Sequence, residues 1–96
     1  MKITVESRAI KWFKEELNIQ SGNFVRFVVR YGGNSTIQFG YSLGLAFEEP
    51  EDIAVSTEQD GIRFFVDSDD IWYFQDYDLV VSYHMEMDEI EFNYVK

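Results

Sequence analysis

The chain has 96 residues, with eighteen acidic and eight basic side chains, so its formal net charge is −10 at neutral pH. A surface this acidic repels phosphate backbones and anionic lipids, which argues against nucleic acid or a membrane as a partner. The absence of cysteine excludes a disulfide framework, a thiolate nucleophile and a cysteine metal site. With no apolar run of membrane-spanning length and no signal-peptide core at residues 1–5, we expect a cytoplasmic protein.

Size and composition predict a single domain over residues 1–96. Hydrophobic residues make up 46% of the chain, which is enough for a packed core, so disorder is not expected. Nine Phe, six Tyr and two Trp are more aromatic side chains than a small core easily covers. We therefore expect some of them at a ligand cleft or a subunit contact.

The N-terminal part predicts a short strand at residues 3–5 followed by an amphipathic helix. Ser7 is the expected N-cap, since its hydroxyl can accept a hydrogen bond from a free amide of the first turn. An apolar stripe at helical spacing follows, formed by Ile10, Phe13 and Leu17. We expect about three turns, ended by the Ser-Gly-Asn sequence at residues 21–23.

Two strands are expected in the centre of the chain, at residues 24–31 and 39–47, with a glycine-rich turn between them. In the first strand, Arg26 and Arg30 share one face. In the second, large side chains alternate with small ones such as Gly44. We expect the large face to be buried and the small face to lie close to another backbone, that of the helix.

The remaining sequence predicts short strands, one tight turn and a second, short helix. The strands are expected at residues 53–56, 62–66, 79–84 and 90–94, and Asp60-Gly61 is expected to form a turn. Ser68 is expected to cap a short helix over residues 71–74, with aspartates in its first turn. The last strand is expected at a sheet edge. The fold class is therefore α+β, mostly β, with short mixed or antiparallel strands, one N-terminal amphipathic helix and one short helix.

In order and spacing, these elements resemble the HesB/IscA-like family of A-type iron–sulfur carriers. The resemblance runs from residues 3–4 through the Gly32-Gly33 loop and the strand of Tyr41 to residues 79–80. It implies a HesB-like domain over residues 1–96. In that family a carrier uses one cysteine in the loop after the Gly-rich strand and a Cys-Gly-Cys pair near the C-terminus.

This chain departs from the family pattern at each of those cysteines. Asn34 or Ser35 stands near the position of the first one, and residues 93–96 contain no Cys-Gly-Cys segment. Neither Asn nor Ser can replace a thiolate as a soft ligand of an iron–sulfur cluster. The resemblance therefore implies a cysteine-free branch that shares the scaffold without the carrier activity.

The main candidate for a binding site is the glycine-rich loop with the side chains around it. Two guanidinium groups near this loop are suited to binding an anionic ligand through paired hydrogen bonds. The predicted ligand-binding residues are Arg26, Arg30, Tyr31, Gly32, Gly33, Asn34, Ser35 and Tyr41. The alternatives are that the arginines pair with carboxylates of the chain itself and that the loop is a plain turn.

Two other clusters contain residue types that occur at metal sites. Counted from Asp67, the sixth and twelfth residues are not the glycine and glutamate of a calcium loop, so helix capping is the preferred interpretation. His84 is the sole histidine, and a metal site needs more ligands than one imidazole beside Met85 and Met87. It is interpreted as a strand-end histidine, with the methionines filling gaps in the core.

No serine has the setting of a nucleophile, and no catalytic residue is predicted. We therefore predict a non-enzymatic HesB/IscA-like domain that binds a protein partner or a small anionic ligand, without a metal or cofactor. It is expected to be a monomer or a homodimer. The alternative is an iron-handling or iron–sulfur cluster assembly protein that uses His84 and carboxylates in place of thiols.

Overall fold

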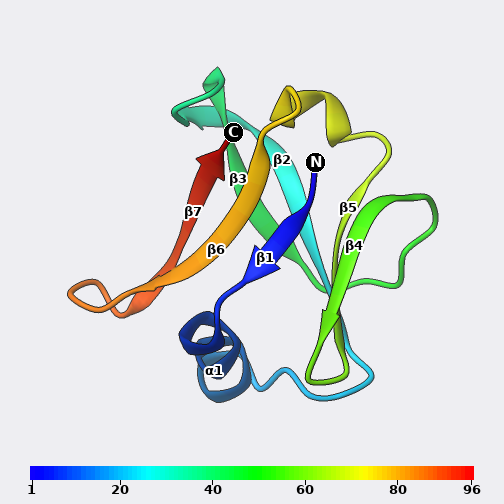
Figure 1. Ribbon diagram of the computed structural model, residues 1–96, viewed down its shortest axis with the longest axis vertical. Coiled ribbons are helices and arrows are strands. Elements are labelled where there is room, and N and C mark those ends of the chain that lie inside the picture. Colours follow the sequence, from blue (N-terminus) through cyan, green and yellow to red (C-terminus); the bar gives the residue numbers. More distant parts are fainter.

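The computed structural model describes residues 1–96 as two small β-sheets that face each other across one core, with a helix at one end (Figure 1). The three-stranded sheet has the order β1-β6-β7, with β1 at Ile3–Val5, β6 at Asp78–His84 and β7 at Glu89–Val95. The four-stranded sheet has the order β3-β2-β5-β4, with β2 at Phe24–Asn34, β3 at Phe39–Ala46, β4 at Ile53–Gln59 and β5 at Ile62–Asp67.

Both sheets are mixed, because β1 runs parallel to β6 and β2 runs parallel to β5, whereas the other pairs are antiparallel. The predicted α+β class is confirmed, and so is the position of the last strand, β7, at a sheet edge. None of the helices has the length and apolarity of a membrane span.

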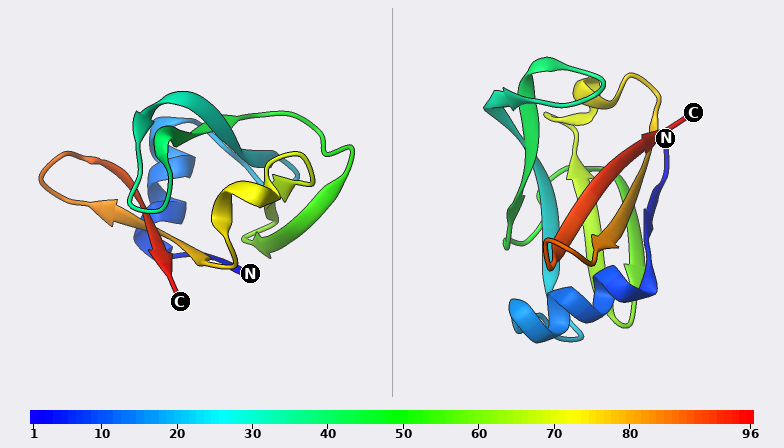
Figure 2. Two further views of the ribbon diagram at one scale, coloured as in Figure 1. Left: turned by 90° about the horizontal axis from the view of Figure 1, so that it is seen from above. Right: turned by 90° about the vertical axis from the view of Figure 1, so that its left-hand side faces the viewer.

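The core consists of apolar side chains from both sheets and from helix α1, which spans Ser7–Glu16, together with Ile19, Tyr73 and Phe74. Ala9, Ile10 and Phe13 are the buried residues of the helix, which confirms the predicted stripe. The Phe13 ring packs against Phe64 with centroids 5.2 Å apart, and Phe64 stacks on Phe27 at 6.1 Å. Helix α1 is thereby held at one end of the two sheets (Figure 2).

The predicted N-cap is wrong. Ser7 is already helical, the N-cap position belongs to Glu6, and no side chain caps the helix. The reason is that β1 leads directly into the helix: the Glu6 amide donates to Val81 of β6, so Glu6 still belongs to the edge of the sheet. The helix also ends at Glu16, earlier than predicted.

The two glycines after Tyr31 do not end β2, contrary to the prediction. Gly32 and Gly33 adopt φ values of 115° and 64° and form an irregularity in the pairing, which resumes between Asn34 and Phe39. Glycine tolerates this left-handed backbone because it has no Cβ. The true connection between β2 and β3 is therefore only residues 35–38.

The predicted faces of β3 are partly wrong. Tyr41, Leu43 and Leu45 of the large face pack against the core, but Phe39 and Phe47 at its two ends are exposed. The small face does not lie against the helix: the space over Gly44 is filled by the side chain of Arg30 from β2.

The second helix is a short 3₁₀ helix, η1, at Ile71–Phe74, and the predicted Ser68 cap is wrong because no side chain caps it. The Oδ1 atom of Asp67 instead accepts a hydrogen bond from the Asp69 amide at 2.9 Å. The predicted turn is confirmed between β4 and β5, where Asp60 and Gly61 have φ values of 53° and 77°.

Candidate functional site

The β2–β3 connection and η1 lie together at the end of the molecule opposite α1 (Figures 1 and 2). They are joined by a row of edge-to-face aromatic rings. Tyr31 of β2 meets Tyr41 of β3 with centroids 5.7 Å apart, and Tyr41 meets Trp72 of η1 at 5.2 Å. We call Tyr31, Tyr41 and Trp72 the aromatic row.

Large aromatic surfaces are open to solvent at this end. The exposed fraction is 90% for Tyr31, 88% for Phe39 and 49% for Trp72. Clustered exposed aromatic side chains mark interaction sites more often than isolated ones do. Several aromatic side chains thus lie outside the core, and their place at a ligand cleft or a subunit contact stays a prediction.

Hydrogen bonds within the hairpin hold these rings in place. The Asn34 side-chain oxygen accepts from the Gly40 amide at 2.7 Å, and the Ser42 hydroxyl donates to the Gly32 carbonyl at 3.1 Å. The Ser35 hydroxyl accepts from the Gln38 amide at 3.0 Å, which closes the short connection. The loop is thus organised by its own polar groups.

The Ser35 side chain also reaches the C-terminal strand. It lies near the phenol of Tyr94, whose hydroxyl forms a hydrogen bond of 2.8 Å with Tyr73. Burial, followed by the hydrogen bond and the charge of Tyr73, raises the pKa of Tyr94, and Ser35 opposes that shift. The loop, η1 and β7 therefore meet at one cluster of hydroxyl groups.

Arg26 is surrounded by carboxylates. Its guanidinium lies 2.6 Å from Glu48, 2.9 Å from Asp70 and 4.0 Å from Asp67. Burial lowers the pKa of Arg26, but the hydrogen bonds and the nearby negative charges outweigh it, so that the net pKa is raised. Because Asp70 directly precedes η1, this ion-pair cluster attaches η1 to β2 and so positions Trp72.

Arg30 has different surroundings, although both arginines lie on the same face of β2, as predicted. Arg26 pairs with Ala46 and Arg30 with Ser42 in the register of the strands. Arg30 is exposed, and no carboxylate lies within ion-pair distance of it. A small anionic ligand at these residues stays a prediction.

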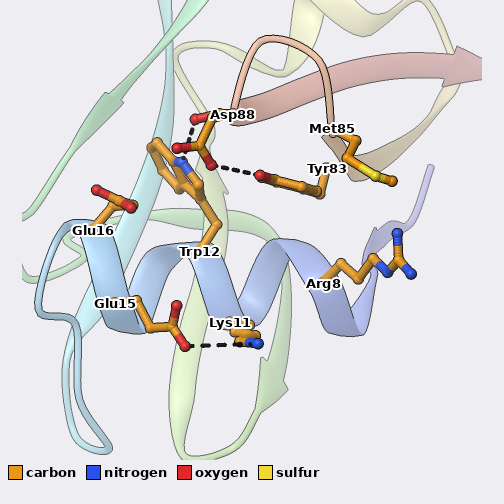
Figure 3. Close-up of a pocket in the computed structure, with 8 residues that line it drawn as sticks. All are labelled: Arg8, Lys11, Trp12, Glu15, Glu16, Tyr83, Met85 and Asp88. Carbon is orange, nitrogen blue, oxygen red and sulfur yellow. Dashed lines mark hydrogen bonds and ion pairs between the residues drawn. The ribbon is translucent and has the colours of Figure 1, made fainter.

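A hollow with a volume of about 350 Å³ lies between α1 and the β6–β7 turn (Figure 3). Most of its polar groups pair with one another. The Trp12 indole donates to the Asp88 carbonyl at 3.1 Å, the Tyr83 hydroxyl donates to the Asp88 carboxylate, and Lys11 lies 3.9 Å from Glu15. The hydrogen bond to Asp88 is the main cause that raises the pKa of Tyr83. These contacts fasten the turn to the helix.

No three side chains among the histidine, aspartates and glutamates of residues 1–96 converge as metal ligands would. The His84 Nδ1 atom accepts a hydrogen bond from the Met87 amide at 3.3 Å in the β6–β7 turn. The interpretation of the methionines as core fillers is wrong: Met85 and Met87 are 65% and 64% exposed, because the turn projects beyond both sheets.

Comparison with known sequences identifies the family of the chain. Residues 1–94 match the family described as iron–sulphur cluster biosynthesis. The chain belongs to this family, the HesB/IscA family. A Bacillus subtilis relative called pyruvate dehydrogenase inhibitor is 49% identical over 94 residues, covering 98% of this chain and 99% of the relative.

Two further relatives are described as uncharacterized proteins. An uncharacterized protein of Staphylococcus saprophyticus is 35% identical over 95 residues, covering 96% of this chain and 97% of the relative. One from Staphylococcus aureus is 35% identical over 96 residues, covering 97% of this chain and 98% of the relative. The HesB/IscA resemblance predicted from the sequence is confirmed.

The side chains at the family's ligand positions do not fit an iron–sulfur cluster. The fold does bring the loop and the C-terminal strand together, since Ser35 lies near Tyr94. The groups that meet there are a serine hydroxyl and a phenol whose pKa is raised, so neither supplies the soft anionic sulfur that a cluster requires. In this HesB/IscA-family protein the shared architecture lacks the cluster ligands.

The fold thus places the predicted site residues in two different environments. Tyr31, Tyr41 and the loop residues lie at one end, whereas the Arg26 guanidinium is occupied by carboxylates. Trp72 was not predicted as a site residue. Its place in the aromatic row depends on a contact with Tyr41, 31 residues away, and no local pattern of the sequence indicates that contact.

Proposed function

We propose that this protein is a non-catalytic inhibitor that acts by binding an enzyme, and that pyruvate dehydrogenase is its target. The support is a 49% identical relative with that name, matched over nearly the whole of both chains. The lack of cysteine ligands supports a role for the scaffold other than cluster transfer. A cytoplasmic location and a monomeric or homodimeric state stay predictions.

We propose the aromatic row together with Phe39 as the binding surface, and call these four residues the hairpin end. The observation that carries this proposal is the exposure of Tyr31 and Phe39, at 90% and 88%, on a hairpin held by its own hydrogen bonds. Exposed aromatic rings in a fixed arrangement lose little conformational freedom on binding, and such residues dominate the affinity of protein interfaces.

The proposal is tested with purified pyruvate dehydrogenase complex from the organism that makes this protein. Increasing concentrations of the chain should inhibit turnover in a saturable manner, and calorimetry should show direct binding. If neither inhibition nor binding is seen at about 100 μM, the interaction is weaker than about −5.5 kcal/mol and the proposed function is wrong.

The surface is tested by replacing the two most exposed aromatic residues in the double variant Tyr31→Ala and Phe39→Ala. Affinity should fall by about 30-fold or more, because truncating anchor residues of an interface costs about 2 kcal/mol or more. The matched control is Met85→Ala with Met87→Ala, which removes two exposed apolar side chains from the β6–β7 turn. Equal affinity of the aromatic variant and the wild type would reject the hairpin end as the surface.

A further inference from the structure

We propose that two copies of this protein associate through β3, an edge strand of the four-stranded sheet, as an antiparallel pair about a two-fold axis at Leu43. The inference goes beyond the proposed function and does not depend on it. It is carried by the open side of β3, by the contrast between β3 and the other edge strands, and by the charge and side-chain pattern of the strand.

Strand β3 is open along one side. It lies at the end of the strand order β3-β2-β5-β4 and is hydrogen-bonded to β2 alone. Residues 41–46 of β3 pair in unbroken register with residues 26–31 of β2, and all six are half-buried. On the open side of an edge strand, alternate N–H and C=O groups have no strand partner, so they are available to another chain.

The other three edge strands have features that disfavour such pairing. Strand β1 has only three residues. Strand β7 carries Glu89 and Glu91, and β4 carries Glu58 and an irregularity in its pairing with β5. Short length, charged side chains and bulges are the usual means by which proteins protect sheet edges. Residues 41–46 of β3 have none of these features, since they include no charged residue and no proline.

The charge distribution favours a second copy of the chain as the occupant of this edge. Two molecules of net charge −10 repel each other, so they approach most easily through a surface that lacks acid. Residues 27–47 contain no acidic side chain, and Arg30 is their only charged residue. A contact along β3 therefore places no carboxylate of one paired strand opposite a carboxylate of the other.

The side chains of β3 also suit pairing of the strand with itself. About a two-fold axis perpendicular to the sheet, antiparallel strands bring equivalent faces together, so the axis passes through a residue rather than between two. With the axis at Leu43, Tyr41 lies opposite Leu45 of the other copy. Ser42 then lies opposite Gly44, so that large residues meet large ones and small residues meet small ones.

Two exposed phenyl rings at the ends of β3 support the same axis. Phe39 begins the strand and is 88% exposed, and Phe47 directly follows the strand and is 54% exposed. Antiparallel pairing about Leu43 brings the Phe39 end of one copy beside the Phe47 end of the other, which covers part of both rings. Because Phe39 is also part of the hairpin end, self-pairing should compete with binding of the target.

Sedimentation equilibrium of the purified chain measures self-association without the target enzyme. The wild type should form a dimer, and Ser42→Lys should raise its dissociation constant about tenfold or more, because lysines of the two copies would lie close together beside the axis. The matched control is Ala54→Lys, which adds the same charge at an exposed position of β4, the other edge of the sheet. It should not raise the dissociation constant.

Cross-linking tests the position of the axis, and only an introduced thiol can react because the chain has no cysteine. Under mild oxidation, Leu43→Cys should form a disulfide-linked dimer about tenfold faster than Ala54→Cys, although Ala54 is the more exposed position. The reason is that a residue on the axis lies within the ~4.4–6.8 Å between Cα atoms that a disulfide requires. Circular dichroism of each variant should show the wild-type fold.

The outcomes judge this inference separately from the proposed function. If the wild type is monomeric at about 1 mM, the inference is overturned, since a specific dimer would be populated at that concentration. It is also overturned if a dimer forms but Leu43→Cys does not cross-link preferentially, or if Ser42→Lys does not weaken the dimer. If the wild type stays monomeric and Ser42→Lys weakens binding to pyruvate dehydrogenase complex, β3 pairs with a strand of the target and not with a second copy.

Discussion

Arg26 and Arg30 project from the same face of β2, but only Arg26 has carboxylate partners within the chain. Arg26 is largely buried, with 20% of its side chain exposed, and it contacts one carboxylate after β3, one at the end of β5 and one before η1. Asp67 and Asp70 are themselves buried at 7% and 9% exposure. The guanidinium therefore stabilises these two buried carboxylates, because a buried charge without a partner lowers the stability of the fold.

Replacing Arg26 by alanine should lower the free energy of unfolding by about 3 kcal/mol, since it leaves two buried carboxylates without their cation. Urea denaturation at neutral pH measures the change. The control is Arg63→Ala, whose partner Glu58 is exposed and whose loss should cost less than about 1 kcal/mol. A similar loss in both variants would contradict the assigned role of Arg26.

Among the elements, the β4–β5 hairpin contains a glycine that its turn requires. Gly61 has a φ of 77°, and its carbonyl accepts a hydrogen bond of 2.8 Å from the Gly22 amide. A Cβ at Gly61 would lie 3.2 Å from the Ser21 Cα atom, so both the backbone conformation and the packing call for glycine. This turn also attaches the segment after α1 to the four-stranded sheet.

Gly61→Ala should lower the free energy of unfolding by about 1–3 kcal/mol because the residue would be strained at positive φ. Gly44→Ala provides the contrast. Its backbone is ordinary and the exposed Arg30 side chain can shift toward solvent to make room for a methyl group, so stability should stay equal or rise by up to about 1 kcal/mol. Thermal unfolding of both variants measures the difference. A stable Gly61→Ala protein would show that the turn tolerates a side chain.

On the scale of the whole molecule, the hydroxyl cluster joins parts that are far apart in the sequence. Tyr73 of η1 and Tyr94 of β7 share a hydrogen bond, and Ser35 of the β2–β3 connection lies beside it. The cluster therefore links both sheets at the end that carries the aromatic row. Its protonated phenols are part of what holds that end together.

This linkage predicts a pH dependence. The pKa of Tyr94 is raised by folding above its ordinary value of 10.0, so the unfolded chain releases this proton first as the pH rises. The stability that the protonated phenol contributes is present below pH 10 and is lost above it. Urea unfolding at pH 8 and at pH 11 should show that Tyr94→Phe loses less stability than the wild type. An equal loss in both proteins would contradict the prediction.

Much of the fold was predictable from local patterns. The stripe of Ile10 and Phe13 predicted α1, and alternation predicted most strands, because the period of apolar residues reflects which face of an element is buried. The boundaries were less accurate. The Glu6 N-cap position and the continuation of β2 through Gly32 depend on pairing with neighbouring strands, which a local pattern does not contain.

The sequence by itself determined the family, the architecture and the loss of cluster ligands, because these follow from the order of elements and from the absence of cysteine. Only the tertiary structure decided which side chains act together. Arg26 meets Asp70 across 44 positions of sequence, and Trp72 completes the aromatic row across 31 positions from Tyr41. Such contacts arise when β2, β3 and η1 converge at one end of the fold, and no short-range property of the chain encodes them.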